Sequence, residues 1–220
     1  MLVLVVDSST PAVTAALVEV TADGVAARAH RCTVDARAHG ELLAPQVDAV
    51  LADADARPGD LSAIVAGLGP GPFTGLRVGL VTAATMGQVL GIPTYGVCSL
   101  DGIGHPAAAG EPVLAASDAR RKEVYWAVYD GAGQRIAGPN VDVPAVAAER
   151  ARDLAVTVAH RYADVLGLPV RAEPRYPDAT ALAALAAERI RAGAPSERLT
   201  PLYLRRPDAV AATGHKPVLP

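Results

Sequence analysis

The chain has 220 residues, of which 51% are hydrophobic, so it can bury a sizeable core as one large domain or two small lobes. Its 20 basic and 23 acidic residues give a net charge of −3, which excludes non-specific nucleic-acid binding driven by an excess of Lys and Arg. No apolar run approaches the roughly 18 residues that span a membrane, and the N-terminal "MLVLVVDSST" lacks the basic start of a signal peptide, so we expect a cytoplasmic protein with no membrane partner.

Apolar runs that end at turn residues predict five strands in the first half of the chain. These strands are residues 2–7, 14–20, 25–33, 61–69 and 92–97, and the first three form a meander. Apolar residues at helical spacing predict two helices, over 39–54 and 74–90, and the second ends at Gly91. Pro45 either lies in the first turn of its helix or kinks it.

The second half begins with the same pattern of strand, acidic turn and strand, over residues 112–130. Asp118 falls where Asp7 falls in the first half, and a third strand within 131–138 and a helix over 178–193 follow. We infer two related lobes: residues 1–104, and a smaller, degraded copy over 105–220 without a clear β-α-β repeat, whose C-terminal segment packs back on the first. The fold class is therefore α/β, with mixed sheets flanked by helices in the duplicated layout of the actin, sugar-kinase and Hsp70 superfamily (ASKHA).

In that layout two hairpin turns face a cleft, where backbone N–H groups can hold a phosphate. The candidate residues for a degenerate phosphate loop are Asp7, Ser8, Ser9, Thr10, Gly69, Gly71, Asp118 and Arg120. Two structural alternatives stay open: an Asx or Ser/Thr turn that closes the first hairpin, and a strand-to-helix connection that needs the glycines. The G-K-[ST] ending of a P-loop is absent, and the second turn, residues 117–123, has no glycine.

Catalytic signatures are missing from the sequence. No two histidines lie three or four residues apart, so no helical pair can bind a metal, and there is no G-x-S-x-G elbow. We predict neither catalytic residues nor metal ligands. A small-molecule kinase and a glycoprotease-like metallopeptidase are the alternatives; the glycine-poor second turn argues against the first and the missing histidine pair against the second. Cys32 and Cys98 form no C-x-x-C pair, and we expect both to be buried thiols.

A stripe of small residues recurs every four positions along the helix over 74–90. It consists of Gly75, Gly79, Ala83 and Gly87. Each glycine costs a helix interior about 1 kcal/mol relative to alanine, so a close approach by another backbone is expected on this face. The approaching backbone belongs either to a partner or to the lobe's own sheet or neighbouring helix.

Six segments then carry a family resemblance. They are "DSST", "RAHGELLAPQVDAVL", "GLGPGPFTGLRVGL", "GIPTYGVCSLDGI", "SDARRKEVYWAVYD" and "PLYLRR", in this order. Together they resemble the TsaB (YeaZ) family, accessory subunits for making threonylcarbamoyladenosine on tRNA, over residues 1–129 and 201–206. TsaD, the similar catalytic subunit, carries two metal-binding histidines where this chain has Ser99 and Ile103.

The resemblance implies a non-catalytic subunit that binds a TsaD-like transferase, works with a TsaE-like ATPase and forms a homodimer when alone. It implies that tRNAs reading ANN codons are reached only through the complex. It implies no cofactor, and any nucleotide is expected to bind weakly at a subunit junction. The two helices of the first lobe are expected to pair with a partner's as a bundle. The expected interface residues are His39, Leu43, Val47, Leu51, Gly75, Arg77, Gly79, Ala83 and Gly87.

Overall fold

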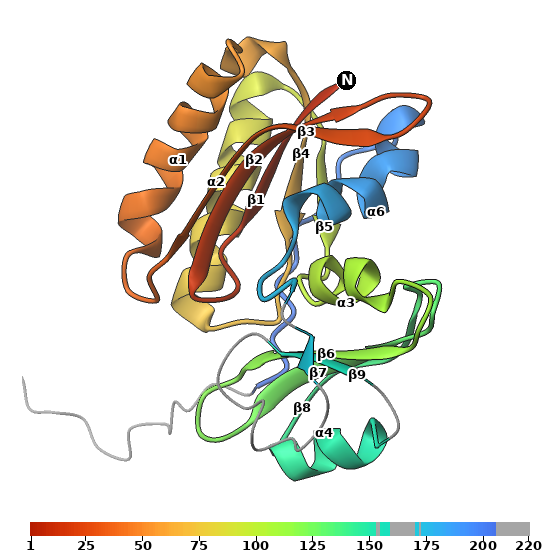
Figure 1. The fold of residues 1–220 in the computed structure, drawn as a ribbon. Helices are drawn as coiled ribbons and strands as arrows, with labels where there is room; N and C mark the ends of the chain where they lie inside the picture. The colour runs from red at the N-terminus through yellow and green to blue at the C-terminus, as the bar shows by residue number, and fades with distance from the viewer. Residues whose placement is uncertain (153–154, 159–169, 172, 206–220) are drawn as a thin grey trace, which may run out of the picture.

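Two five-stranded sheets form the framework of the computed structural model, which describes residues 1–152, 155–158, 170–171 and 173–205 (Figure 1). The strand order of the first sheet is β3-β2-β1-β4-β5, and that of the second is β10-β9-β6-β7-β8. Read from opposite ends, the two orders are the same, because β6 to β10 occupy the places of β1 to β5. The duplicated layout expected from the hairpins is therefore present in both sheets.

The first sheet is mixed. Its strands are β1 (Leu2–Asp7), β2 (Ala12–Val20), β3 (Val25–Val34), β4 (Leu61–Gly67) and β5 (Thr94–Val97). The central strand β1 pairs antiparallel with β2 and parallel with β4. Because helices cover both faces of this sheet, β1 is apolar from Leu2 to Val6 instead of alternating, and its prediction from an apolar run is confirmed.

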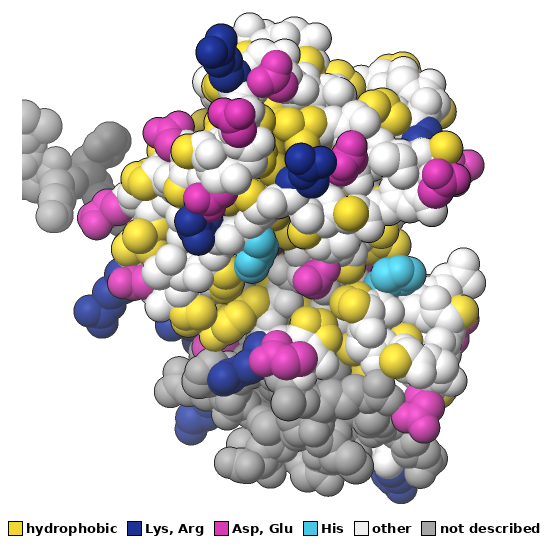
Figure 2. Space-filling model, turned by 45° about the horizontal axis from the view of Figure 1, so that its top comes forward, with side chains coloured by type: hydrophobic (Ala, Val, Ile, Leu, Met, Phe, Trp, Pro, Cys, Tyr) yellow, Lys and Arg dark blue, Asp and Glu magenta, His cyan; other side chains and the backbone are white. Residues whose placement is uncertain are grey.

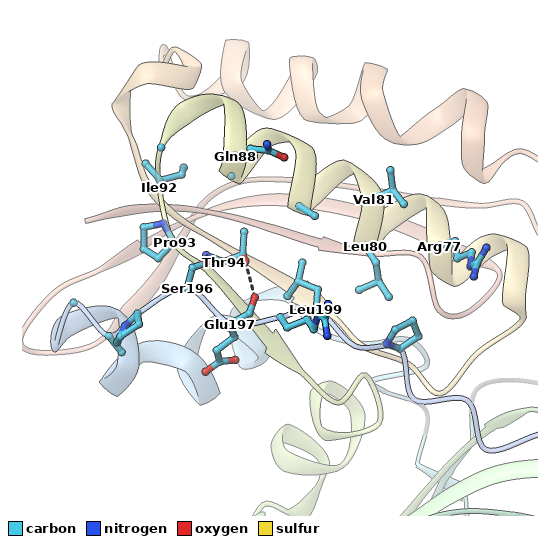
Figure 3. Close-up of a pocket in the computed structure, with 18 residues that line it drawn as sticks. Arg77, Leu80, Val81, Gln88, Ile92, Pro93, Thr94, Ser196, Glu197 and Leu199 are labelled. Carbon is cyan, nitrogen blue, oxygen red and sulfur yellow. Dashed lines mark hydrogen bonds between the residues drawn. The ribbon is translucent and has the colours of Figure 1, made fainter.

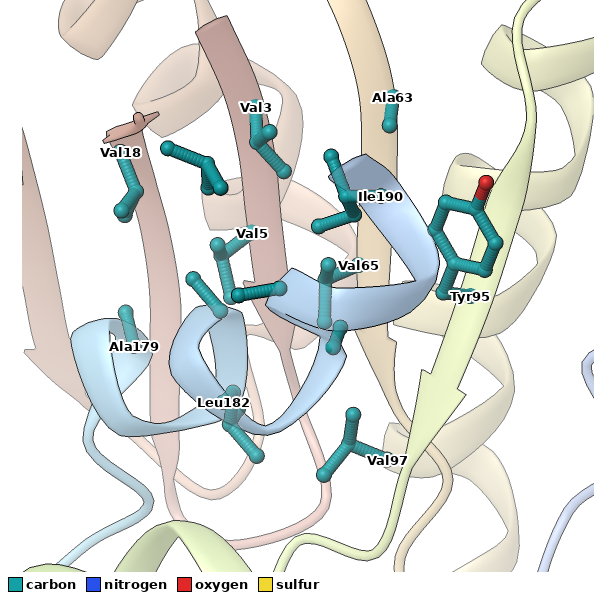
Figure 4. Packing of buried hydrophobic residues seen from close by; sticks show 14 of the residues in the cluster. Val3, Val5, Val18, Ala63, Val65, Tyr95, Val97, Ala179, Leu182 and Ile190 are labelled. Atoms are coloured by element: carbon teal, nitrogen blue, oxygen red, sulfur yellow. The ribbon is translucent and has the colours of Figure 1, made fainter. Parts of the chain in front are cut away.

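Helices pack on both faces of the first sheet. The two helices α1 (His39–Asp53) and α2 (Phe73–Leu90) cover the face that carries Leu4 and Val6. Helix α6 (Ala179–Arg191) covers the opposite face, where Leu182 and Ile190 pack on Val3 and Val5 (Figure 4). This alternation follows from the two-residue repeat of a strand.

Pro45 lies inside α1, beyond its first turn, and the helix continues to Asp53. Of the two sequence interpretations of this proline, placement in the first turn is therefore wrong. The structure also holds a short 3-10 helix, η1 (Pro58–Asp60), that the sequence did not predict.

The second sheet is more complete than expected. Its strands are β6 (Val113–Asp118), β7 (Val124–Tyr129), β8 (Arg135–Asp142), β9 (Ala155–Val158) and β10 (Val170–Arg171). The helix α4 (Pro144–Arg150) follows β8, and β9 pairs parallel with both β6 and β10. The expectation that no β-α-β unit follows the second meander is therefore wrong; strands of four and two residues leave too short a pattern to detect.

Two further segments connect the lobes. Helix α3 (Asp101–Ala108) crosses the predicted boundary at residue 104: Ile103 packs into the core of the second lobe, while Gly102 lies against Leu182 of α6. Residues 194–205, which we call the C-terminal strap, run from the first lobe to the second. Within the strap, the amide of Glu197 donates to the carbonyl of Thr94 at 2.8 Å.

Candidate functional site

The turn between β1 and β2 is held by a buried carboxylate. Asp7 Oδ1 accepts hydrogen bonds from the amide and hydroxyl of Ser9, at 2.9 and 2.8 Å. The Ser99 hydroxyl donates to Asp7 Oδ2 at 2.5 Å and accepts from the amide of Gly69 at 3.0 Å. Burial raises the pKa of Asp7, although the hydrogen bonds from Ser99 and Ser9 and the nearby His39 lower it. All bonds of this carboxylate stay inside the lobe.

The same turn touches both helices of the first lobe. The Ser8 hydroxyl donates to the carbonyl of Gly75 and accepts from the amide of Gly79, both at 2.8 Å. His39, the first residue of α1, places Nε2 2.8 Å from the carbonyl of Thr10, so this nitrogen donates. Ser8 and Thr10 therefore fix α2 and α1 against the end of the sheet.

Two predicted loop glycines are needed by the connection between β4 and α2. Gly69 has a φ of +86°, a left-handed conformation that favours glycine. A Cβ on Gly71 would lie 2.2 Å from the carbonyl oxygen of Ser9. Gly69 is therefore explained by its own backbone conformation and Gly71 by the close approach of the β1–β2 turn, as in the structural alternative for this loop.

A cavity of about 490 Å³ separates the two hairpin turns, as the ASKHA layout predicts. Of the predicted phosphate-loop residues, Ser9 and Thr10 line it from the first turn and Asp118 and Arg120 from the second. The other four members lie outside this lining: Asp7, Ser8, Gly69 and Gly71. Phosphate binding by the lining residues stays a prediction.

The second turn lacks glycine but adopts the conformations that glycine favours. Arg120, Arg121 and Lys122 have φ values of +65°, +50° and +63°. Side chains in this region crowd their own backbone, so the turn carries local strain. Asp118 Oδ1 accepts from the amide of Arg120 at 2.7 Å and helps to hold the turn.

The residues predicted for the partner interface are almost all buried inside the first lobe. They are His39, Leu43, Val47, Leu51, Gly75, Gly79, Ala83 and Gly87, whereas Arg77 is exposed. A Cβ on Gly79 would lie 2.6 Å from Ser8 Oγ, and one on Gly87 would lie 2.5 Å from Thr94 Cγ2. The small-residue stripe thus faces the lobe's own turn and sheet, and its assignment to a partner is wrong.

The outward face of α2 was not predicted from the sequence. On this face Phe73 is 53% and Val81 61% exposed. The Arg77 guanidinium lies 4.0 Å from the centre of the Phe73 ring, and Tyr203 of the C-terminal strap stacks on the same ring at 5.3 Å. Four-residue spacing of Phe73, Arg77 and Val81 on one side of the helix was the signal that could have found it.

A groove of about 900 Å³ runs between α2 and the C-terminal strap (Figure 3). Leu80, Val81 and Gln88 line it from α2, and Ser196 and Leu199 from the strap. The apolar face of α2 therefore continues into a hollow beside it.

Neither a metal-binding cluster nor a candidate membrane-spanning helix is present in the part of the chain that the structure describes. There, no group of three or more His, Cys, Asp or Glu residues could hold a metal ion, and no helix is long and apolar enough to cross a membrane. Figure 2 shows basic and acidic side chains interspersed over one face.

Cys98 is buried, and burial raises its pKa to about 12. Cys32 is exposed, so the expectation of two buried thiols is wrong for Cys32.

Comparison with known proteins adds a family to this geometry. A profile of the family described as TsaD, tRNA N6-adenosine threonylcarbamoyltransferase, matches residues 32–162. An uncharacterized protein of Mycobacterium tuberculosis is 48% identical over 207 residues, 94% of this chain and 93% of that protein. One of Mycobacterium leprae is 47% identical over 212 residues, 96% of this chain but 57% of that protein's length.

Two further similarities carry more specific names. The tRNA threonylcarbamoyladenosine biosynthesis protein TsaB of Escherichia coli is 35% identical over 133 residues, 59% of this chain and 55% of that protein. Among solved structures, YeaZ from Pseudomonas aeruginosa is similar over 92% of this chain and 99% of that chain, with a TM-score of 0.74 and 27% identity. Sequence and fold therefore agree on the same group of proteins.

Proposed function

Because the chain belongs to the TsaD family, in which it is a TsaB (YeaZ) homologue, we propose that it is the non-catalytic subunit that binds and supports a TsaD-like transferase. In this role it takes part in making threonylcarbamoyladenosine on tRNAs that read ANN codons, together with a TsaE-like ATPase. It reaches tRNA only through the complex, forms a homodimer when the catalytic subunit is absent, and has no cofactor of its own.

The non-catalytic role is supported by how Ser99 and Ile103 are bonded and packed. These two residues occupy the positions where the resemblance places metal ligands. The Ser99 hydroxyl is bonded to Asp7 and to the amide of Gly69. Ile103 is fully buried among apolar side chains of the second lobe. A metal needs ligand atoms that are free and converge on one point, so these two residues do not fit one.

The exposed face of α2 is the surface that best suits the partner. Arg and Tyr are enriched among the residues that dominate binding energy at protein interfaces, and Arg77 and Tyr203 meet here. Their contact, with Arg77 Nε 3.0 Å from the Tyr203 hydroxyl, orders both side chains before binding. Val81 and Val89, which is 78% exposed, extend the apolar surface along the helix.

This proposal is tested by association with the TsaD-like protein of the native host and by tRNA modification in its presence. Val81→Asp places a charge on the apolar face, so we expect about tenfold or greater loss of affinity, equivalent to at least 1.4 kcal/mol. The matched control is Ile136→Asp, because Ile136 is 62% exposed on β8 of the second lobe. We expect the control to bind like the wild type, with both thermal midpoints unchanged.

Three results would contradict the proposal. The first is failure of the wild-type chain to associate with the TsaD-like protein. The second is tRNA modification by this chain alone with a stoichiometric metal bound. The third is low-micromolar ATP binding by the isolated chain with phosphoryl transfer, which would favour the small-molecule kinase instead.

A further inference from the structure

A buried hydroxyl lies within the hydrogen-bond ladder of α2. The carbonyl of Gly75 and the amide of Gly79 are four residues apart, which is the pair that an α-helix joins directly. Ser8 Oγ is 2.8 Å from each of them, donating to the first and accepting from the second. Ser8 is 1% exposed, so no water competes for these bonds. One side chain from the β1–β2 turn thus bonds both members of a helical pair.

The β1–β2 turn and α2 lie very close together at Ser8. A Cβ on Gly79 would lie 2.6 Å from Ser8 Oγ, and one on Gly75 would lie 3.1 Å from the Ser8 carbonyl oxygen. The helix backbone therefore approaches the turn as closely as glycine allows. Gly75 and Gly79 lie within the first two turns of α2, so Ser8 fixes the N-terminal half of this helix against the β1–β2 turn.

The turn itself is anchored on both sides of Ser8. Asp7 is bonded to Ser99 of the segment before α3, and Thr10 is bonded to His39 of α1. Ser8 is therefore held in place by its neighbours while it holds α2. A shift of the turn that keeps these two bonds moves α2, and with it the outward residues Arg77 and Val81.

We propose that Ser8 is a positioning residue that sets where α2 presents its outward face to a binding partner. The inference rests on the proposed function, because it assumes that this face binds the TsaD-like subunit. Ser8 acts through the backbone of α2 from the buried side of the helix and touches no partner.

The test compares Ser8→Ala with Thr14→Val at a temperature where both variants are folded. Thr14 is the matched control, because it is 2% exposed on β2 and its hydroxyl donates to Cys32 Sγ instead of a helix. We expect Ser8→Ala to weaken association with the TsaD-like protein about tenfold, the equivalent of one typical hydrogen bond, while Thr14→Val changes it little. In the free chain, amide hydrogen exchange along α2 should accelerate in Ser8→Ala but not in Thr14→Val.

A second variant keeps the inference testable if Ser8→Ala does not fold. Gly79→Ala should displace the Ser8 hydroxyl from the other side and weaken association similarly, because its Cβ would lie 2.6 Å from Ser8 Oγ. Equal affinity and exchange in Ser8→Ala and wild type would overturn the inference and leave the proposed function intact. Faster exchange in Ser8→Ala without any wild-type association would overturn the proposed function and support the positioning of α2 by Ser8.

Discussion

At the scale of single residues, Asp7 shows how burial and hydrogen bonding oppose each other. Three donor groups from Ser9 and Ser99 stabilise its charged form, while loss of water disfavours it, and the second effect prevails, so the pKa of Asp7 is raised. A carboxyl with a raised folded-state pKa favours protonation in the native state. Its contribution to stability is therefore fully present below the unfolded pKa and is lost as the pH rises through the folded pKa.

Asp7→Asn removes this titration while keeping an oxygen acceptor for Ser9. We expect the free energy of unfolding of the variant to increase relative to that of the wild type as the pH rises above 3.8, the ordinary pKa of an aspartate side chain. The gain is about 1.4 kcal/mol per pH unit until the folded-state pKa is passed. Urea unfolding of both proteins between pH 4 and 8 measures it, with the exposed Asp23→Asn as control. A difference that stays constant over this range would contradict the expectation.

At the scale of elements, α2 has one buried face of small residues and one exposed face of larger side chains. Its inward face carries Gly75, Gly79, Ala83 and Gly87 and is filled by the β1–β2 turn and by β5. Its outward face carries Phe73, Val81 and Val89 and stays exposed. The glycines thus allow the helix to lie close to its own sheet, which leaves the larger side chains to form the outer surface.

Gly87→Ala tests the inward packing directly. Its Cβ would lie 2.5 Å from Thr94 Cγ2, and overpacking of this kind costs about 1–3 kcal/mol. Adding Thr94→Ser deletes that methyl group but keeps the hydroxyl, which donates to the carbonyl of Glu197. We expect the double variant to recover most of the loss, because alanine gains about 1 kcal/mol over glycine in a helix. Thermal denaturation of the wild type, both single variants and the double variant measures the coupling, and purely additive effects would refute it.

At the scale of the whole molecule, the C-terminal strap joins the lobes. Leu202 donates its amide to the carbonyl of Leu68 at 2.8 Å in the first lobe. Arg205 donates to the carbonyl of Ala119 at 2.7 Å and pairs with Glu123 at 2.8 Å, at the two ends of the strained turn of the second lobe. The position of this turn beside the cavity therefore depends on a residue far away in the sequence.

Arg205→Ala should loosen the β6–β7 turn without unfolding the chain. The variant loses a partly exposed ion pair, worth about 0–1 kcal/mol, and a hydrogen bond worth about 1 kcal/mol, so the thermal midpoint should fall by only a few degrees. Amide exchange in residues 119–123 should become about tenfold faster, while exchange in the first sheet stays as in the wild type. Arg28→Ala, which breaks an exposed pair with Glu19, serves as control. Equal changes in both lobes would show that the strap does not act locally.

The sequence by itself determined the longer strands and helices of the first lobe and the duplicated plan. Buried central strands need continuous apolar runs and amphipathic helices need apolar residues at helical spacing, so β1, α1 and α2 could be predicted from local pattern. The matching turns at Asp7 and Asp118 revealed the repeat, and the six quoted segments revealed the family. The strands β9 and β10 were not predicted, because strands of four and two residues are too short to show a recognisable hydrophobic pattern.

The tertiary structure alone decided which surfaces are free. A stripe of small residues indicates that another backbone approaches closely, but that backbone can belong to a partner's helix or to the chain's own turn. The hydrogen bond between the Gly79 amide and Ser8 Oγ shows that it belongs to the chain's own turn. The exposure of Cys32 and the fully bonded state of Ser99 likewise depend on strands and loops distant in the sequence. Local pattern records that a residue is small, apolar or polar. Which atoms lie opposite it is set only when the whole chain has folded.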